Sequence, residues 1–388
     1  MDLNPTLLSL LPLAVMAAFG FGWLAARFDL RQWKREQADS PKAYYRGLNL
    51  LLNEQQDKAI DAFIEAMQQD PGTADLHFAL GNLFRRRGEY ERAVRVHEHL
   101  LARGDLAESE RARAQFALAQ DFLKAGLFDR AEAAFRTLDG SAFATDARLE
   151  LLGLYERSRD WHAAIETARK LESSGAGSFA ARIAHHACEL ALEADARQRP
   201  EEARAALARA REAAPQAPRP QVLQGLALAR AGQPAEALAA WQPLLVSQPS
   251  IAALVAGEIA TAARAAGQVE AVRARLLEAY RLAPSQDLLN ALHQLTDDPQ
   301  AQASLLNEAL ASRPGLSGAA ALLRHQAAQG EGLNPAQTET LARVVAAGAR
   351  PQQRYRCAAC GFEAQNYFWQ CPGCQTWDSY PPQRLEDA

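Results

Sequence analysis

The sequence predicts an all-α protein, a superhelical solenoid of helix pairs with an N-terminal transmembrane helix and a small C-terminal four-cysteine module. Three observations predict this fold class. An uncharged apolar stretch lies near the N-terminus, a pattern of small and large apolar residues recurs over residues 40–348, and two Cys-x-x-Cys pairs lie within residues 351–388.

Length and composition narrow the class of protein. The chain has 388 residues, which exceeds the roughly 250 to 300 residues at which a single core stops growing, so several modules or a repeat array are expected. The net charge of -4 shows no excess of basic residues, which argues against a nucleic-acid-binding protein. Five cysteines in this length exclude a disulfide-rich secreted scaffold, and the composition excludes a disordered chain.

Residues 1–26 are predicted to form a transmembrane anchor. No charged residue occurs from Leu3 to Ala26, and a helix of about 20 apolar residues crosses the roughly 30 Å of hydrocarbon in a bilayer. A cleaved signal peptide would need a positively charged start, whereas Asp2 is the only charged side chain before the apolar stretch.

Residues 27–39 are predicted to be a basic juxtamembrane linker. Basic residues are enriched on the cytoplasmic side of membrane spans. This positive-inside rule places the linker, and with it the bulk of this single-pass chain, on the cytoplasmic side. Within the anchor, Ala14, Ala18 and Gly22 share one helix face, which is either a packing face for another helix or ordinary membrane-helix composition. The sequence leaves open whether the chain forms an oligomer through this helix or through the repeats. The basic residues of the linker are Arg27, Arg31, Lys34 and Arg35.

Residues 40–348 are predicted to form about eight to nine helix pairs, of which the last are degenerate. Gly47 and Ala59 recur 34 residues later as Gly81 and Ala93, a period typical of tetratricopeptide repeats. Small residues let the two helices of a pair approach, and the next pair covers the remaining apolar stripe. Such a solenoid has a concave surface suited to protein partners. Later copies carry Ala131 and Phe135, Ala164 and Leu171, Ala203 and Leu207, Ala237 and Trp241, and Leu276 and Ala279.

Two histidine clusters within the array are interpreted as structural. His185 and Cys188 share one helix face, but no second pair of ligands is near them in the sequence. A packed helix with a buried thiol is expected there rather than a metal site. His97 and His99 are interpreted as surface residues or as part of an apolar stripe.

The C-terminal cysteines predict a metal site. Cys357 and Cys360 form one pair, and Cys371 and Cys374 form another after ten intervening residues. Two such turns present four thiolates that complete a tetrahedral site for one iron or zinc ion. Two redox-active dithiols are the alternative, although a reducing compartment disfavours structural disulfides.

This module, residues 351–388, is expected to be structural. Protein ligands would fill all four positions, which leaves none open for catalysis, and the metal is expected to supply the folding free energy of so short a segment. Gly361, Pro372 and Gly373 are expected to shape the two turns. The aromatic side chains are expected to cover the metal and to dock against the last repeats. They are Tyr355, Phe362, Tyr367, Phe368, Trp369, Trp377 and Tyr380.

An N-terminal anchor, a tetratricopeptide array and a C-terminal CxxCGF…WxCPxCxxW segment together resemble the lipopolysaccharide assembly protein B family of Gram-negative bacteria. The most specific parts are residues 46–66 and 357–380. The resemblance implies a rubredoxin-like module in which Cys357, Cys360, Cys371 and Cys374 bind the metal. It also implies an inner-membrane adaptor that restrains lipopolysaccharide synthesis by promoting degradation of the deacetylase LpxC by the protease FtsH. Implied partners are FtsH, LpxC and lipopolysaccharide transport or regulatory membrane proteins.

The residues themselves favour a protein-binding scaffold over an enzyme. The sequence has no P-loop, GxSxG, HExxH or Rossmann glycine pattern, so nothing along the chain suggests a catalytic centre. Two alternatives to the adaptor stay open. One is a general envelope-assembly scaffold without a proteolytic role, and the other is an iron tetrathiolate redox protein.

Overall fold

The computed structural model describes residues 45–50, 52–53, 55–69, 73–330 and 335–387. The chain divides into two compact units, unit 1 ending at Arg159 and unit 2 beginning at Asp160. Among the described residues, no helix has the length and apolar character needed to cross a membrane. The predicted anchor, residues 1–26, and linker, residues 27–39, lie outside the described residues.

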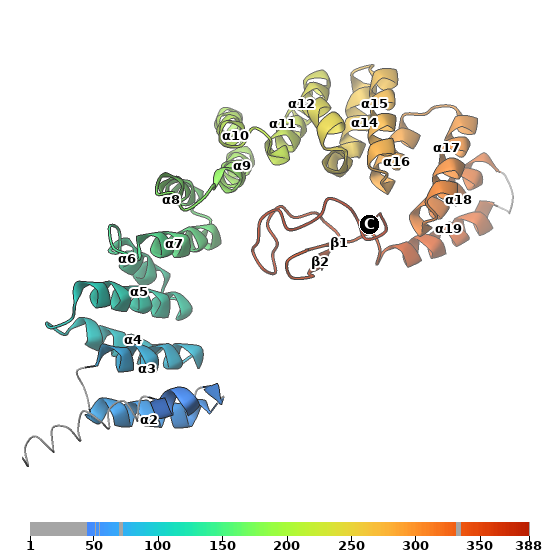
Figure 1. The fold of residues 1–388 in the computed structure, drawn as a ribbon. Helices are drawn as coiled ribbons and strands as arrows, with labels where there is room; N and C mark the ends of the chain where they lie inside the picture. Colours follow the sequence, from blue (N-terminus) through green and yellow to red (C-terminus); the bar gives the residue numbers. More distant parts are fainter. Residues whose placement is uncertain (1–44, 51, 54, 70–72, 331–334, 388) are drawn as a thin grey trace, which may run out of the picture. The chain divides into compact units, whose positions relative to one another are not determined.

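Unit 1 is a stack of paired helices joined by short connections (Figure 1). Gly88 and Gly126 lie in the connections after α3 and α5 with φ of 78° and 77°, a left-handed conformation that strains residues with a Cβ. After a helical stretch at residues 45–50, the helices are α2 (Gln56–Gln69), α3 (Ala74–Arg86), α4 (Tyr90–Leu101), α5 (Glu108–Lys124), α6 (Phe128–Arg136) and α7 (Ala144–Ser158).

Glycines on the first helix of a pair face rings on the second. A Cβ at Gly47 would lie 2.7 Å from Cε1 of Phe63, and a Cβ at Gly81 would lie 2.5 Å from Nε2 of His97. The two glycines precede their rings by the same number of residues (63 − 47 and 97 − 81). The packing therefore repeats with the sequence, which confirms the predicted role of the small residues.

A buried ionic network joins three helices of unit 1. Asp121 of α5 is fully buried, and its carboxylate accepts a hydrogen bond of 2.7 Å from Arg85 of α3. Its other oxygen lies 2.5 Å from Nδ1 of His97 on α4. The prediction for the two histidines of α4 is confirmed, because His97 belongs to the buried stripe and His99 is exposed.

Unit 2 continues the paired helices and ends in the four-cysteine module. Figure 1 shows the module on the inner side of the curved row of helices in this unit. The helices are α8 (Trp161–Ser173), α9 (Ala180–Ala196), α10 (Pro200–Ala213), α11 (Pro218–Arg230), α12 (Pro234–Ser247), α13 (Pro249–Ala252), the 3-10 turn η1 (Ala253–Val255), α14 (Ala256–Ala265), α15 (Val269–Leu282), α16 (Gln286–Gln294), α17 (Pro299–Ser312), α18 (Leu316–Gln329) and α19 (Pro335–Ala349).

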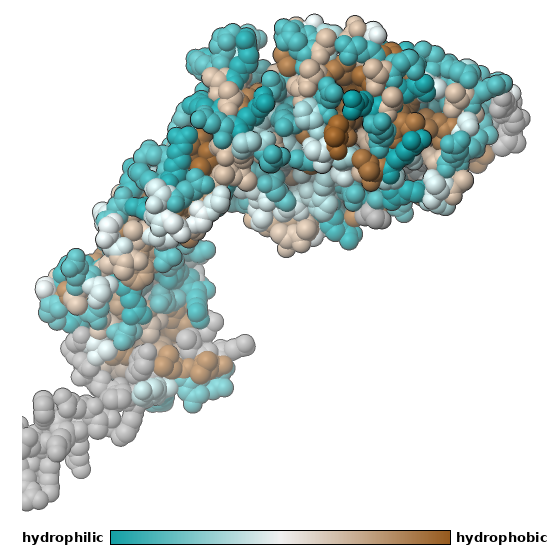
Figure 2. Space-filling view, turned by 45° about the horizontal axis from the view of Figure 1, so that its top comes forward, coloured by the Kyte–Doolittle hydropathy of each residue, from teal (hydrophilic) through white to brown (hydrophobic). Residues whose placement is uncertain are grey.

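The largest core of unit 2 extends from α11 to α16 around the fully buried Trp241. Proline is the first residue of α10, α11 and α12. It is tolerated there because a backbone N–H at the first helical position has no acceptor within the helix. On the face shown in Figure 2, hydrophilic residues predominate and hydrophobic ones show through in small groups between them. The apolar side chains of the core from α11 to α16 lie between the helices.

The module contains two short strands, β1 (Tyr355–Arg356) and β2 (Glu363–Ala364). They pair antiparallel, with Tyr355 opposite Ala364 and Arg356 opposite Glu363. An isolated antiparallel bridge joins Gln370 to Trp377. Each pairing encloses one Cys-x-x-Cys turn, so the two cysteine pairs are held in similar surroundings.

Candidate metal centre

The two cysteine turns are closed by equivalent backbone hydrogen bonds. The N–H of Cys357 donates to the carbonyl of Phe362, and the N–H of Cys371 donates to that of Thr376, each at 2.9 Å. The residue after each second cysteine is left-handed, with φ of 77° at Gly361 and 59° at Gln375. The expectation for Gly361 is confirmed, and the left-handed residue of the second turn is Gln375, for which no role was predicted.

The four sulfur atoms converge. The metal-ligating atoms of Cys357, Cys360, Cys371 and Cys374 all lie within 4.8 Å of one another. The Sγ–Sγ distance is 3.8 Å between Cys357 and Cys374, and 3.7 Å between Cys360 and Cys371. Four sulfurs placed about 2.3 Å from a central ion lie roughly 3.8 Å apart at the corners of a tetrahedron. The cysteines are therefore arranged to bind one metal ion.

Hydroxyl groups favour the thiolate form of two of these cysteines. Ser379 Oγ lies 3.2 Å from Cys357 Sγ, and this hydrogen bond lowers the pKa of the Cys357 thiol to about 6. Thr376 Oγ1 lies 3.3 Å from Cys374 Sγ and lowers the pKa of that thiol in the same way. Thiolates are the form that binds metal, so these hydroxyls support the site.

Two residues after the second turn dock the module on helices α8 and α9. The ring of Trp377 stacks on His185 with centroids 4.6 Å apart and an interplanar angle of 20°. It makes T-shaped contacts with Trp161, at 6.5 Å between centroids and an interplanar angle of 72°, and with His186, at 5.8 Å and 73°. The carboxylate of Asp378 lies 2.7 Å from Nε2 of His185. The contact therefore combines aromatic stacking with a charged hydrogen bond.

An arginine on α11 continues this contact. The guanidinium of Arg219 lies 5.6 Å from the ring centroid of Trp377 and 5.8 Å from that of Trp369. It also donates to Glu189 at 2.6 Å, and its side chain is only 6% exposed. A buried cation needs such a partner, and Glu189 supplies it.

Equivalent positions of successive repeats contact the C-terminal segment. His185, Arg219, Leu254 and Asp287 follow one another at intervals of 34, 35 and 33 residues (219 − 185, 254 − 219 and 287 − 254). His185 and Arg219 contact Trp377, Leu254 packs against the cluster around Cys357 and Cys371, and Asp287 binds Arg384. The module thus follows the inner face of unit 2 from repeat to repeat.

The prediction that the aromatic face docks against the last repeats is wrong for the two tryptophans. Trp369 and Trp377 pack on α9 and α11, in the middle of the array, because these helices supply the rings and the cation that indoles bind. Phe362 and Phe368 remain 44% and 36% exposed. The last helices are occupied instead by the chain terminus.

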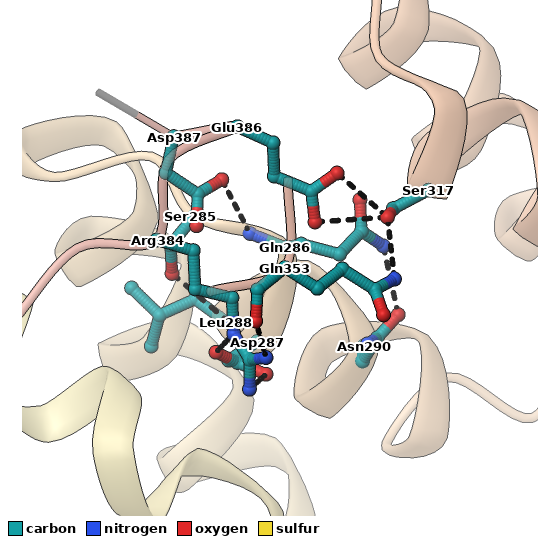
Figure 3. A network of polar contacts seen from close by, with 10 residues as sticks. All are labelled: Ser285, Gln286, Asp287, Leu288, Asn290, Ser317, Gln353, Arg384, Glu386 and Asp387. Carbon is teal, nitrogen blue, oxygen red and sulfur yellow. Dashed lines mark hydrogen bonds and ion pairs between the residues drawn. The ribbon is translucent and has the colours of Figure 1, made fainter. Parts of the chain in front are cut away.

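The C-terminal tail binds α16 and α18 through polar contacts (Figure 3). Arg384 donates to the carboxylate of Asp287 at 2.9 and 3.2 Å, and Glu386 accepts from Ser317 at 2.7 and 2.8 Å. Asp387 accepts from the backbone N–H of Gln286 at 3.2 Å, at the first residue of α16. Burial raises the pKa of Asp387 to about 6.

Known proteins match both the module and the chain as a whole. Residues 355–381 match the family model described as Rubredoxin metal binding domain. The chain is 30% identical to lipopolysaccharide assembly protein B of Escherichia coli (strain K12), over 98% of this chain and 100% of that protein. The chain belongs to the lipopolysaccharide assembly protein B family. The protein of the same name from Haemophilus influenzae (strain ATCC 51907 / DSM 11121 / KW20 / Rd) is 27% identical, over 97% of this chain and 98% of that one.

Among solved structures, the chain is similar to YrrB, described as a tetratricopeptide-repeat protein with an unusual peptide-binding site. The match has 15% identity and a TM-score of 0.33, and it covers 46% of this chain and 88% of that chain.

In this member of the lipopolysaccharide assembly protein B family, the sequence predicted the four cysteines of the site. It did not predict the residues around them or the surface on which the module docks. His185 was interpreted as a packed helix residue, and it is buried as expected, yet it also binds Asp378. The roles of Asp378, Arg219 and Ser379 were not predicted. A signal for two of them exists, because Asp378 directly follows a tryptophan beside a cysteine turn and Arg219 lies one repeat after His185.

Proposed function

We propose that this chain is a membrane-anchored scaffold that acts in lipopolysaccharide assembly. The observation that carries this proposal is the end-to-end relationship to proteins named lipopolysaccharide assembly protein B. The paired-helix solenoid supports it, because repeat arrays of this kind provide extended surfaces for other proteins. The predicted anchor, residues 1–26, would hold the scaffold at the inner membrane with its bulk in the cytoplasm.

The finer proposal is that the chain is an adaptor. It would bring LpxC to the membrane protease FtsH, and so restrain lipopolysaccharide synthesis, in contact with lipopolysaccharide transport or regulatory membrane proteins. Tethering raises the effective concentration of a bound client near a membrane-embedded protease, and linked binding of this kind increases avidity by roughly 10²-fold or more. The solenoid then needs no catalytic centre of its own.

A translation-arrest chase of LpxC tests the adaptor. Deletion of residues 1–26 should lengthen the half-life of LpxC, because the tether is lost while the paired helices keep their neighbours. Cys371→Ser should also lengthen it, through loss of the module. Cys188→Ser is the matched control, since Cys188 lies in the core of the α9–α10 pair and outside the module. An unchanged half-life in both lesions, at normal protein abundance, would favour a general envelope scaffold.

Topology is tested separately. A periplasm-active reporter fused after Ala388 should be silent if the basic residues that follow the anchor stay in the cytoplasm. A cytoplasm-active reporter at the same position is the positive control. Strong periplasmic activity would contradict the proposed orientation without bearing on the adaptor role.

A further inference from the structure

The inner face of unit 2 contains an aromatic slot with one cationic wall. Trp161 and His186 stack with centroids 5.7 Å apart, and His185 lies beside His186 on α9. Arg219 of α11 forms the cationic wall. His185 and His186 belong to α9 and Arg219 belongs to α11, and each of these helices is the first of a pair, α9 with α10 and α11 with α12. In this chain the slot is filled by Trp377 and Asp378.

We propose that this slot is a binding surface for a segment that presents an aromatic ring followed by a carboxylate, and that metal binding decides whether the chain's own Trp377 and Asp378 fill it. The module is then a plug held in place by its metal. With the metal bound, the slot is closed to other proteins, and without it the slot is open to a partner segment of the same chemistry.

The shape of the plug depends on the second cysteine turn. The N–H of Asp378 donates to the carbonyl of Trp369 at 2.8 Å, and Gln370 pairs with Trp377. Asp378 has φ of 51°, a left-handed conformation that a non-glycine residue keeps only where its surroundings hold it. The turn between Cys371 and Cys374 provides those surroundings. A short module of this size has little core of its own, so loss of the metal should release this conformation.

The chemistry of the slot defines the kind of occupant. Nε2 of His185 binds the carboxylate of Asp378 at 2.7 Å, while the ring of His185 stacks on Trp377. Arg219 lies against the same indole. An aromatic ring satisfies the stacking surfaces and the cation, and an acidic group placed next to it satisfies the histidine. A purely aliphatic segment would leave the imidazole nitrogen without its acceptor.

Hydroxyl-radical footprinting of the full-length chain tests the metal dependence. Side-chain oxidation is measured by mass spectrometry before and after removal of the metal under reducing conditions. Oxidation of Trp161 and His186 should rise severalfold. Trp241 is the internal control, because it is fully buried between α11 and α12 and should stay protected. Continued protection of Trp161 and His186 would overturn the proposal, and so would a parallel rise at Trp241, since the solenoid itself would then be unfolding.

A Trp377→Ala/Asp378→Gly chain, which leaves neither side chain of the plug in the slot, tests the occupant with the metal still bound. Elemental analysis should show full metal content, because no cysteine is altered, and Trp161 should become severalfold more reactive. A peptide copying residues 375–380, added at millimolar concentration, should restore the protection of Trp161. The same peptide with alanine in place of tryptophan should not. Protection by neither peptide, or by both equally, would overturn the assigned partner chemistry. These readouts involve no client protein, so their failure is distinguishable from failure of the adaptor role.

Discussion

Gly225 of α11 lies directly beneath the indole of Trp241 on α12, so closely that a Cβ at Gly225 would overlap Nε1 of the ring. That nitrogen donates to the carbonyl of Val222 at 3.3 Å, which holds the indole in place. The ring is fully buried. The close approach of these two helices therefore depends on the absence of a side chain at residue 225.

Gly225→Ala should lower the free energy of unfolding of unit 2 by about 1 to 3 kcal/mol, the usual range for overpacking a core. The measurement is urea unfolding followed by circular dichroism. Gly257→Ala in α14 is the matched control, because a Cβ there has no atom within 4 Å. It should leave stability unchanged or slightly higher. Equal losses in both variants would show that helix glycines matter here for another reason.

Asp121→Ala should destabilise unit 1 by about 3 to 5 kcal/mol, the range for removing one partner of a buried ion pair. The carboxylate is fully buried, and its loss removes the negative charge that faces Arg85 and the group that His97 Nδ1 contacts, while Arg85 still donates to Asn82 and to the carbonyl of Ala117. Glu91→Ala is the control, since the Glu91 side chain in its pair with Arg95 is 93% exposed. Chemical unfolding of both variants checks the expectation, and a similar midpoint for the two would contradict a structural role of the network.

One metal ion per chain is expected, and Cys371→Ser should lose it. The converging sulfurs provide four ligands, and removal of one from a closed tetrahedral site weakens binding severely. Elemental analysis measures the metal content, and an ultraviolet-visible spectrum distinguishes coloured iron from colourless zinc. Cys188→Ser should keep the full metal content. Retention of the metal by Cys371→Ser would refute the assignment of the ligands.

Docking of the C-terminal tail should weaken as pH rises. Burial raises the pKa of Asp387 from its ordinary 3.8 to about 6, so the docked tail holds a proton that the free tail has already released. Docking is then strongest below about pH 4, declines as pH rises to about 6, and stays constant above that.

Amide hydrogen exchange of Leu385 and Glu386, corrected for intrinsic rates, measures this docking. Their N–H groups donate to the carbonyls of Arg354 and Gln352 at 2.8 and 3.0 Å. Asp387→Asn keeps the acceptor oxygen without the titration, so protection in that variant should be flat over the same pH range. Protection that falls equally in the variant would assign the pH dependence to another group.

Local patterns in the chain determined the classes of structure that it forms. The recurrence of Gly47 as Gly81, and of Ala59 as Ala93, indicates helix pairs, because small residues at a fixed period let the neighbouring helices of one repeat approach each other. The spacing of Cys357, Cys360, Cys371 and Cys374 is also a local pattern. It predicts a metal site because each turn brings its two sulfurs together within four residues.

Only the tertiary structure decided where the module docks. His185 and Asp378 are 193 residues apart, and no local pattern indicates that the imidazole of one faces the carboxylate of the other. That contact depends on the small rotation from each repeat to the next, summed over several helix pairs, which sets the curvature of the inner face. The same curvature directs Trp377 to α9 and Arg384 to Asp287 of α16, because a module tethered after α19 contacts whichever helices the curve brings opposite it.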